Sequence, residues 1–177
     1  MTRFLLVAIC MVAACRENCK ERIAGLYKAN RKALEHQRAV NKFTLQLAYV
    51  PAAVLTREDP NDTLPAQKDT AYYYFKLQVV CPAEETLGNG NNTALLYGLD
   101  SLFATTEAQP FANPELVEPV ITGNKKRFEY LLVFAKKDFA AGKEVKVVFF
   151  DRLFTNTKQV FVFDRKKIDE IETLQCK

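Results

Sequence analysis

The chain has 177 residues, 49% of them hydrophobic, and a formal net charge of +4. This length predicts one domain with accessory segments, and the apolar content excludes a disordered chain. The basic excess is too small and too scattered for nucleic-acid binding. The sequence contains one histidine, His36, and one serine, Ser101, which excludes most catalytic templates that combine these residue types.

The first segment has the pattern of an export signal. Met1-Thr2-Arg3 carries a positive charge, and an uninterrupted apolar run follows from residue 4 to residue 14. A bilayer-spanning helix takes about 20 residues, whereas the apolar region of a signal peptide takes about 7–15. Residues 1–14 are therefore predicted to be a signal peptide.

The end of this run is more specific. Val12-Ala13-Ala14-Cys15 resembles the lipobox of bacterial lipoproteins. The resemblance implies that the Cys15 thiol receives a diacylglycerol, that residues 1–14 are cleaved off, and that the new amine is acylated later. Two or more acyl chains hold a protein stably at a membrane. The alternative is an ordinary secretory signal cut near Ala14, with Cys15 in a disulfide.

Residues 17–40 predict a helix, because Lys, Arg, Glu, Ala and Leu dominate and proline is absent. Residues 15–42 are thus expected to form a lipidated N-terminus and a basic helical stalk. One interpretation places this stalk close to anionic lipid headgroups. The other, which the composition favours, is a solvated helix whose thin apolar face packs on a sheet.

Alternating apolar and polar residues predict strands over 43–49 and 71–80. In the second strand, Tyr73 and Phe75 would face one side, and Tyr72 and Tyr74 the other. The exposed tyrosines are a possible binding surface for a sugar or a protein partner. Aromatic packing in the core or at an edge is the favoured alternative.

The remaining segments complete a mostly-β pattern. Loops or turns are predicted over 56–70, 84–93 and 136–143, a short strand over 94–99, irregular edge pieces over 105–123, strands over 127–135, 144–151 and 159–164, and a short helix over 165–175. Successive strands at short spacing favour an antiparallel β-sandwich, Ig-like or related, over residues 43–177. An N-terminal helix and a short C-terminal helix flank it.

This organisation resembles small uncharacterised lipoproteins of Bacteroidota-type bacteria. The lipobox, the helical lead and the strand pair 127–135 and 144–151 carry the resemblance. Three tripeptides agree with it, because they match the acidic–hydroxyl–aliphatic pattern of O-glycosylation in that group: Asp62-Thr63-Leu64, Asp69-Thr70-Ala71 and Asp100-Ser101-Leu102.

The cysteines favour disulfide chemistry over catalysis. A nucleophilic Ser101, Cys19, Cys81 or Cys176 would need activation by His36, which falls in the charged helical segment. Exported chains lie where disulfides persist, and three cysteines remain after lipidation of Cys15. Cys81 and Cys176 are the most plausible bridge, with Cys19 left over.

The sequence evidence for a metal site or for a pair of catalytic carboxylates is also weak. Cys15 and Cys19 are the only close pair of zinc-type ligands, and residues 58–62 lack the glycine and distal glutamate of an EF-hand. Asp151 and Asp164 each end a strand and could share a rim, as a glycosidase requires. We expect no metal, no cofactor and no catalytic residue.

The leading hypothesis is a non-enzymatic lipoprotein of the cell envelope, on the outer membrane or its periplasmic face, that binds an envelope protein or a glycan. It would contact the membrane through the lipid anchor, and we expect no nucleic-acid partner. The alternative is a eukaryotic secreted domain with disulfides, N-glycosylated at Asn61 and Asn91, which begin acceptor sequons. A small carboxylate-based hydrolase is the weakest candidate.

Overall fold

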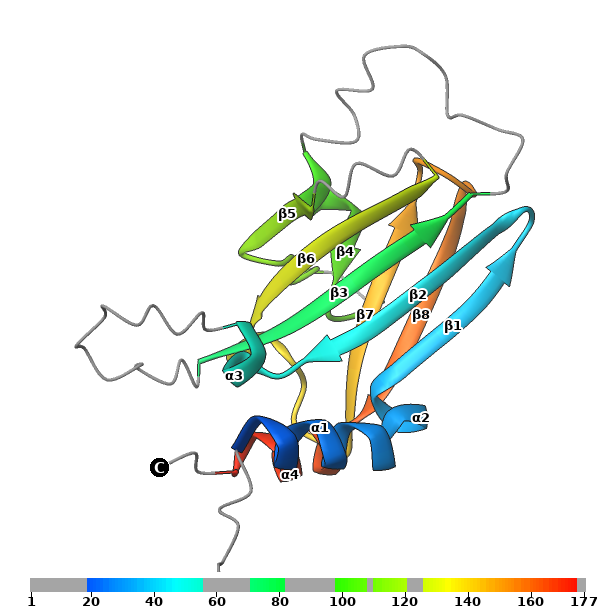
Figure 1. Ribbon diagram of the computed structural model, residues 1–177. Helices are drawn as coiled ribbons and strands as arrows, with labels where there is room; N and C mark the ends of the chain where they lie inside the picture. Colours follow the sequence, from blue (N-terminus) through cyan, green and yellow to red (C-terminus); the bar gives the residue numbers. More distant parts are fainter. Residues whose placement is uncertain (1–18, 56–70, 82–97, 108–109, 121–125, 175–177) are drawn as a thin grey trace, which may run out of the picture.

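A computed structural model describes residues 19–55, 71–81, 98–107, 110–120 and 126–174 (Figure 1). The helices are α1 (Cys19–Ala29), α2 (Arg31–Leu34), α3 (Ala52–Leu55) and α4 (Arg165–Glu172), with 3₁₀ turns η2 (Leu99–Leu102) and η3 (Lys136–Asp138). The strands are β1 (Glu35–Val40), β2 (Phe43–Val50), β3 (Tyr72–Val80), β4 (Phe103–Ala104), β5 (Leu116–Val120), β6 (Arg127–Ala135), β7 (Glu144–Asp151) and β8 (Thr157–Asp164).

The described strands form two antiparallel sheets, which confirms the predicted mostly-β class. One sheet has five strands in the order β1-β2-β3-β6-β5, and the other has three in the order β4-β7-β8. The alternation of buried and partly exposed residues along β2 and β3 follows the two-residue period in the sequence. Tyr73 and Phe75 face one side of the sheet and Tyr72 and Tyr74 the other, as predicted, and the side of Tyr73 and Phe75 is the buried one.

Aromatic side chains fill the space between the sheets. The Phe75 ring of β3 lies 4.9 Å from the Phe163 ring of β8, measured between centroids, so these two residues join the sheets directly. Phe134 and Phe139 also pack around Phe75. Each fully buried phenylalanine contributes about 1.5–3 kcal/mol relative to an exposed one. This shared core positions every surface discussed below.

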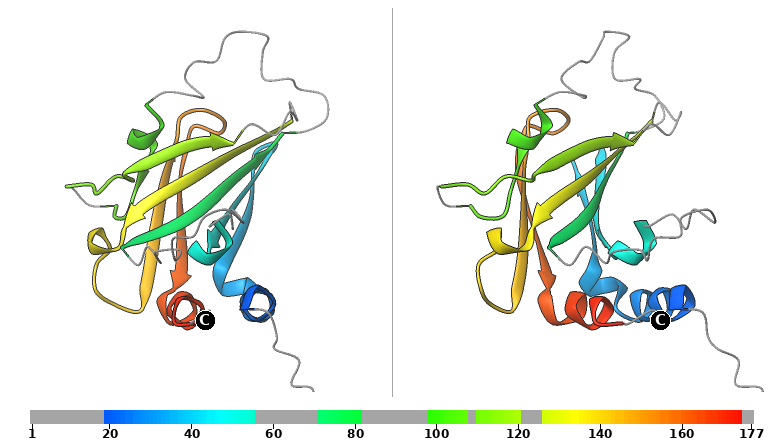
Figure 2. Two further views of the ribbon diagram at one scale, coloured as in Figure 1. Left: turned by 60° about the vertical axis from the view of Figure 1, so that its left-hand side comes forward. Right: turned by 90° about the vertical axis from the view of Figure 1, so that its left-hand side faces the viewer.

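Helices α1, α2 and α4 close one end of the core. We call these three helices the helical base. Figure 2 shows α1 and α4 side by side across this end. Ile23 of α1, Leu34 of α2, and Ile168 and Ile171 of α4 are buried in the same core as the sheets. The thin apolar stripe of the N-terminal segment therefore packs against the body, as in the favoured interpretation of that segment.

Residues 35–40 correct the predicted helix over 17–40, because they form strand β1. All six pair with β2, and the hairpin turns at Asn41, whose φ of 53° is a conformation that asparagine tolerates. The inward positions of β1 include His36 and Arg38, so no apolar alternation marked this strand. Pairing with β2 overrode the local helical preference.

Two smaller segments differ in detail from the expectation. Leu99 begins the 3₁₀ turn η2 instead of ending a strand, and residues 94–97 lie outside the described part. The proline-rich segment 105–123 does contain an edge piece, β5, which pairs with β6 even though Pro119 lacks a backbone donor.

Candidate functional site

Asp151 is the most deeply buried charged residue among those described, with 1% of its surface exposed. Its carboxylate accepts hydrogen bonds from the backbone amides of Leu153, Phe154 and Thr155 at 2.9–3.0 Å. The Thr155 hydroxyl donates a fourth bond at 2.6 Å. All four bonds close the turn between β7 and β8. Asp151 is thus the anchor of a turn, and both of its carboxylate oxygens accept hydrogen bonds from that turn.

Asp164 lies at the other end of the same strand pair. Its carboxylate accepts from the Lys166 amide at 2.9 Å and so caps the first turn of α4. Asp151 and Asp164 do not share the rim that a glycosidase would require, because β7 and β8 are antiparallel: Asp151 pairs with Thr157, and Asp164 with Glu144. Seven residues of strand separate the carboxylates by about 23 Å, whereas glycosidase pairs lie about 5–9.5 Å apart.

Ser101 and His36 are not brought together. Ser101 donates its hydroxyl to the Gly98 carbonyl at 2.8 Å within η2, beside β4 at one edge of the three-stranded sheet. His36 lies in β1, and its ring meets that of Phe163 in β8, at the opposite edge. Burial lowers the pKa of His36 below its ordinary value, and a hydrogen bond with the Val162 backbone raises it by less. Among the residues that the structure describes, Ser101 and His36 are not placed beside each other as nucleophilic catalysis would need.

Cys81 is a buried thiol with no disulfide to another described residue. Burial raises the pKa of this thiol, the reverse of what a reactive cysteine requires. Cys176 and the side chain of Cys19 lie outside the described part. The Cys81–Cys176 bridge therefore stays a prediction.

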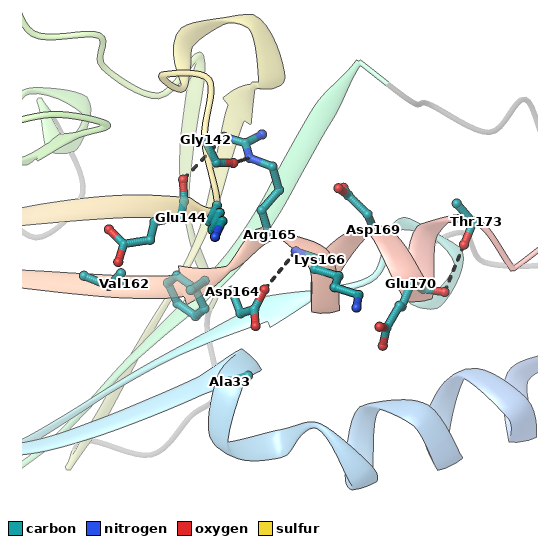
Figure 3. Close-up of a pocket in the computed structure, with 12 residues that line it drawn as sticks. Ala33, Gly142, Glu144, Val162, Asp164, Arg165, Lys166, Asp169, Glu170 and Thr173 are labelled. Carbon is teal, nitrogen blue, oxygen red and sulfur yellow. Dashed lines mark hydrogen bonds between the residues drawn. The ribbon is translucent and has the colours of Figure 1, made fainter.

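A groove of about 950 Å³ runs along the helical base between α2, α4 and the end of the β7–β8 pair. Arg165 spans one side of it (Figure 3) and donates to the carbonyls of Ala140 and Gly142 at 2.9 and 2.8 Å. Its third nitrogen donates to the Tyr73 hydroxyl at 3.3 Å. Arg165 therefore fastens the loop after η3 to the start of β3 and to α4.

Three of the four acidic residues that line this groove are also engaged in local structure. Asp164 caps α4, Glu170 pairs with Lys167 at 2.9 Å, and Glu144 pairs with Lys146 at 3.4 Å. The groove thus combines groups that stabilise the helical base. Arg165 was not singled out from the sequence. It directly follows the aspartate that ends a predicted strand and begins a predicted helix, and this position at a strand–helix junction was the available signal.

The outer face of the five-stranded sheet divides into two halves. Its polar half is linked internally: Glu129 accepts from Gln78 at 2.9 Å and pairs with Arg127 at 2.5 Å, and Glu35 accepts from Gln46 at 2.6 Å. Lys76 lies 3.8 Å from Glu129. These contacts hold the side chains of this half in place on the sheet.

The other half carries the tyrosines, and we call it the tyrosine face, defined as Val50, Tyr72, Tyr74, Leu116 and Val133. The strand register sets four of them in one row, Val50–Tyr74–Val133–Leu116, across β2, β3, β6 and β5. Tyr72 and Tyr74 are half-buried, and Leu116 is 49% exposed. A row that mixes flat aromatic and aliphatic groups at a surface suits stacking or apolar contact with a ligand.

Several predicted features lie outside the described residues. These are Cys15, the loop 58–62, the sequons at Asn61 and Asn91, and two of the three O-glycosylation tripeptides. The third, Asp100-Ser101-Leu102, forms most of η2, where Ser101 is exposed. In the part of the chain that the structure describes, no three His, Cys, Asp or Glu side chains gather as metal ligands. None of the described helices is long and apolar enough to cross a membrane.

The fold and its surfaces define a mostly-β domain of two antiparallel sheets with a helical base. Comparison with protein-family models, with curated proteins and with solved structures gives no match to this chain. Function must therefore be argued from the chain's own residues.

Proposed function

We propose that this protein is a membrane-anchored lipoprotein of the cell envelope that acts as a non-enzymatic binding module. The observation that carries the proposal is Val12-Ala13-Ala14-Cys15, placed directly after an apolar run too short to span a bilayer. Acylated Cys15 would stand four residues before α1 and so tether the domain by its helical base. The outer membrane, or its periplasmic face, is the location that this anchor fits.

The body of the module would be a β-sandwich of the Ig-like or a related kind. Two antiparallel sheets that share one aromatic core support this assignment. The tyrosine face would bind an envelope protein or a glycan, because its apolar and aromatic groups lie together on one sheet surface. The structural use of Asp151, Asp164 and Arg165 supports a binding role over a hydrolytic one.

The anchor is tested by replacing Cys15 with serine. Without the thiol no diacylglycerol can be attached, so we expect the Cys15→Ser protein to leave the membrane fraction or to keep its signal peptide. Intact mass of the membrane-extracted wild-type protein should show the loss of residues 1–14 and the addition of acyl chains. Cys19→Ser is the matched control and should mature normally.

Two results would contradict the proposal. One is a Cys15→Ser protein that matures and partitions like the wild type. The other is a water-soluble wild-type product with N-glycans at Asn61 or Asn91, which would favour the secreted alternative.

A further inference from the structure

The outward side of the helical base carries an excess of positive charge. Residues 21–34 contain four basic side chains and one acidic, Glu21. Arg31 is paired with Glu35 at 2.7 Å, whereas Arg22, Lys28 and Lys32 are exposed. In α4 the charges balance, because its sequence RKKIDEIE has three basic and three acidic residues. The excess is thus concentrated on α1 and α2.

The outward face of α1 is also smooth. Ile23 is buried, and Leu26 and Tyr27 pack partly against the core; burial raises the pKa of Tyr27 to about 12. The exposed positions between the basic residues are Ala24, Gly25 and Ala29. Small residues let a helix approach a flat surface closely. The absence of large apolar groups from the described exposed face means that this helix would lie on a surface without inserting into it.

Chain length fixes how far this face can stand from an anchor at Cys15. Four residue steps separate Cys15 from Cys19, where α1 begins, and they span at most about 14 Å. Helix α1 itself is about 16 Å long. At physiological ionic strength the screening length is about 8 Å, and the tether is short enough to let these charges come within that distance of the headgroups.

From the short tether, the charge excess and the smooth face, we propose that the outward face of α1 and α2 binds anionic lipid headgroups through Arg22, Lys28 and Lys32. This inference rests on the proposed lipid anchor and deepens it. The contact would dock the helical base on the bilayer and orient the sheets, with the tyrosine face, outward from the membrane. The contact is electrostatic, so it requires anionic lipid and weakens as the salt concentration rises.

Lysine footprinting on the full acylated protein tests this contact. The protein is reconstituted into vesicles of phosphatidylcholine, with or without phosphatidylglycerol, and treated with an amine-acetylating reagent. Mass spectrometry then gives the modification rate of each lysine. With phosphatidylglycerol, we expect Lys28, Lys32 and Lys166 of the helical base to react about fivefold more slowly. High salt should restore their rates, while Lys42 and Lys126 at the far end should not change.

Two matched triple variants separate location from net charge. In R22Q/K28Q/K32Q, the reporter Lys166 should react equally fast on both kinds of vesicle. In K42Q/K126Q/R152Q, which removes the same charge from the opposite end, Lys166 should stay protected. Circular dichroism of both variants would establish that they are folded.

The failure of this inference is distinguishable from failure of the anchor. Acyl chains on Cys15 in the intact mass, with Lys166 equally reactive on both vesicles, would overturn the headgroup contact and leave the anchor standing. Protection that persists in R22Q/K28Q/K32Q would also overturn it. An intact mass without acyl chains would overturn the proposed anchor itself.

Discussion

At the scale of single residues, the buried polar groups hold the fold together. Asp151 accepts four hydrogen bonds and has almost no exposed surface, so it fixes the turn between β7 and β8. A buried carboxylate is tolerated only when its oxygens are satisfied in this way. The two aspartates that end β7 and β8 thus look alike in sequence but differ in burial and in how much they stabilise the fold.

Replacing Asp151 with alanine should destabilise the protein far more than replacing Asp164. Asp151→Ala leaves three buried or part-buried backbone amides without their acceptor, which costs about 2–4 kcal/mol. Asp164→Ala removes one helix cap on an exposed turn and costs about 1 kcal/mol. Urea unfolding followed by circular dichroism measures both values. Equal losses would contradict the role assigned to Asp151.

His36 should make stability depend on pH. Burial lowers its pKa, and among the described residues its Nε2 atom has no hydrogen-bond partner. The unfolded chain takes up a proton near its ordinary pKa of about 6.5, whereas the folded protein does so only at lower pH. The stabilisation is therefore complete above about pH 6.5 and is lost as the pH falls towards the folded pKa.

The measurement is the free energy of unfolding between about pH 7.5 and 5.5, where the slope from one group cannot exceed about 1.4 kcal/mol per pH unit. Arg38 is the charged neighbour that lowers the pKa of this ring. Glu35, the preceding residue, has its own pKa lowered by its hydrogen bond from Arg31, so it titrates below this range. In His36→Gln the slope should flatten. An unchanged slope would assign the dependence to another group.

At the scale of elements, the two sheets meet along β1 and β8 through side chains. Arg38 of β1 donates to the Gln159 side chain at 3.3 Å and to the Val160 carbonyl at 2.6 Å, and its guanidinium lies 5.1 Å from the centre of the Phe161 ring. An unpaired strand edge is a site where other chains add strands. Arg38 occupies part of the β8 edge.

Replacing Arg38 with alanine should loosen this junction. We expect a loss of about 1 kcal/mol, since the hydrogen bonds to the Val160 carbonyl and the Gln159 side chain and the contact with the Phe161 ring disappear from an exposed site. Hydrogen exchange should rise at the amides of β1 and β8 more than at those of β3. Arg152→Ala, which removes another exposed arginine, is the control and should leave both measurements unchanged.

At the scale of the whole molecule, the base and the tyrosine face lie on different elements, so anchoring and binding can be separated by mutation. The base is formed by helices, whereas the tyrosine face belongs to β2, β3, β5 and β6. A protein that is tethered at one end can present a sheet surface to a partner without changing its attachment.

The binding role predicts that Tyr72→Ser and Tyr74→Ser together reduce contact with the partner while leaving the anchor intact. A photoreactive residue at Leu116 would crosslink the partner in native envelopes, and we expect the crosslink yield to fall at least about tenfold, because two aromatic contacts at a binding surface carry several kcal/mol. Gln37→Ser, on the same sheet face, is the control. An unchanged yield from a folded double variant would contradict the binding role of this face.

The accuracy of the predictions differs between kinds of segment. Strands β2, β3, β6 and β7 agree with their predicted ranges to within one residue, because apolar alternation is a local signal of a half-buried strand. β1 was missed because its inward side chains are His36 and Arg38, and only the partner strand makes such a segment extended. Asp151 and Asp164 were correctly placed at strand ends, but their separation depends on the direction in which β7 and β8 pair.

The sequence by itself determined the mostly-β class, most strand positions and the short helix after β8, since side-chain periodicity and capping residues act within a few positions of the chain. It also carries the lipobox, a linear motif on which the proposed anchor rests. Tertiary structure alone decided which residues meet: Arg38 with β8, Arg165 with Tyr73, and the row of Val50, Tyr74, Val133 and Leu116. These contacts join residues distant in sequence, so pairing and packing create them, and no local pattern encodes them.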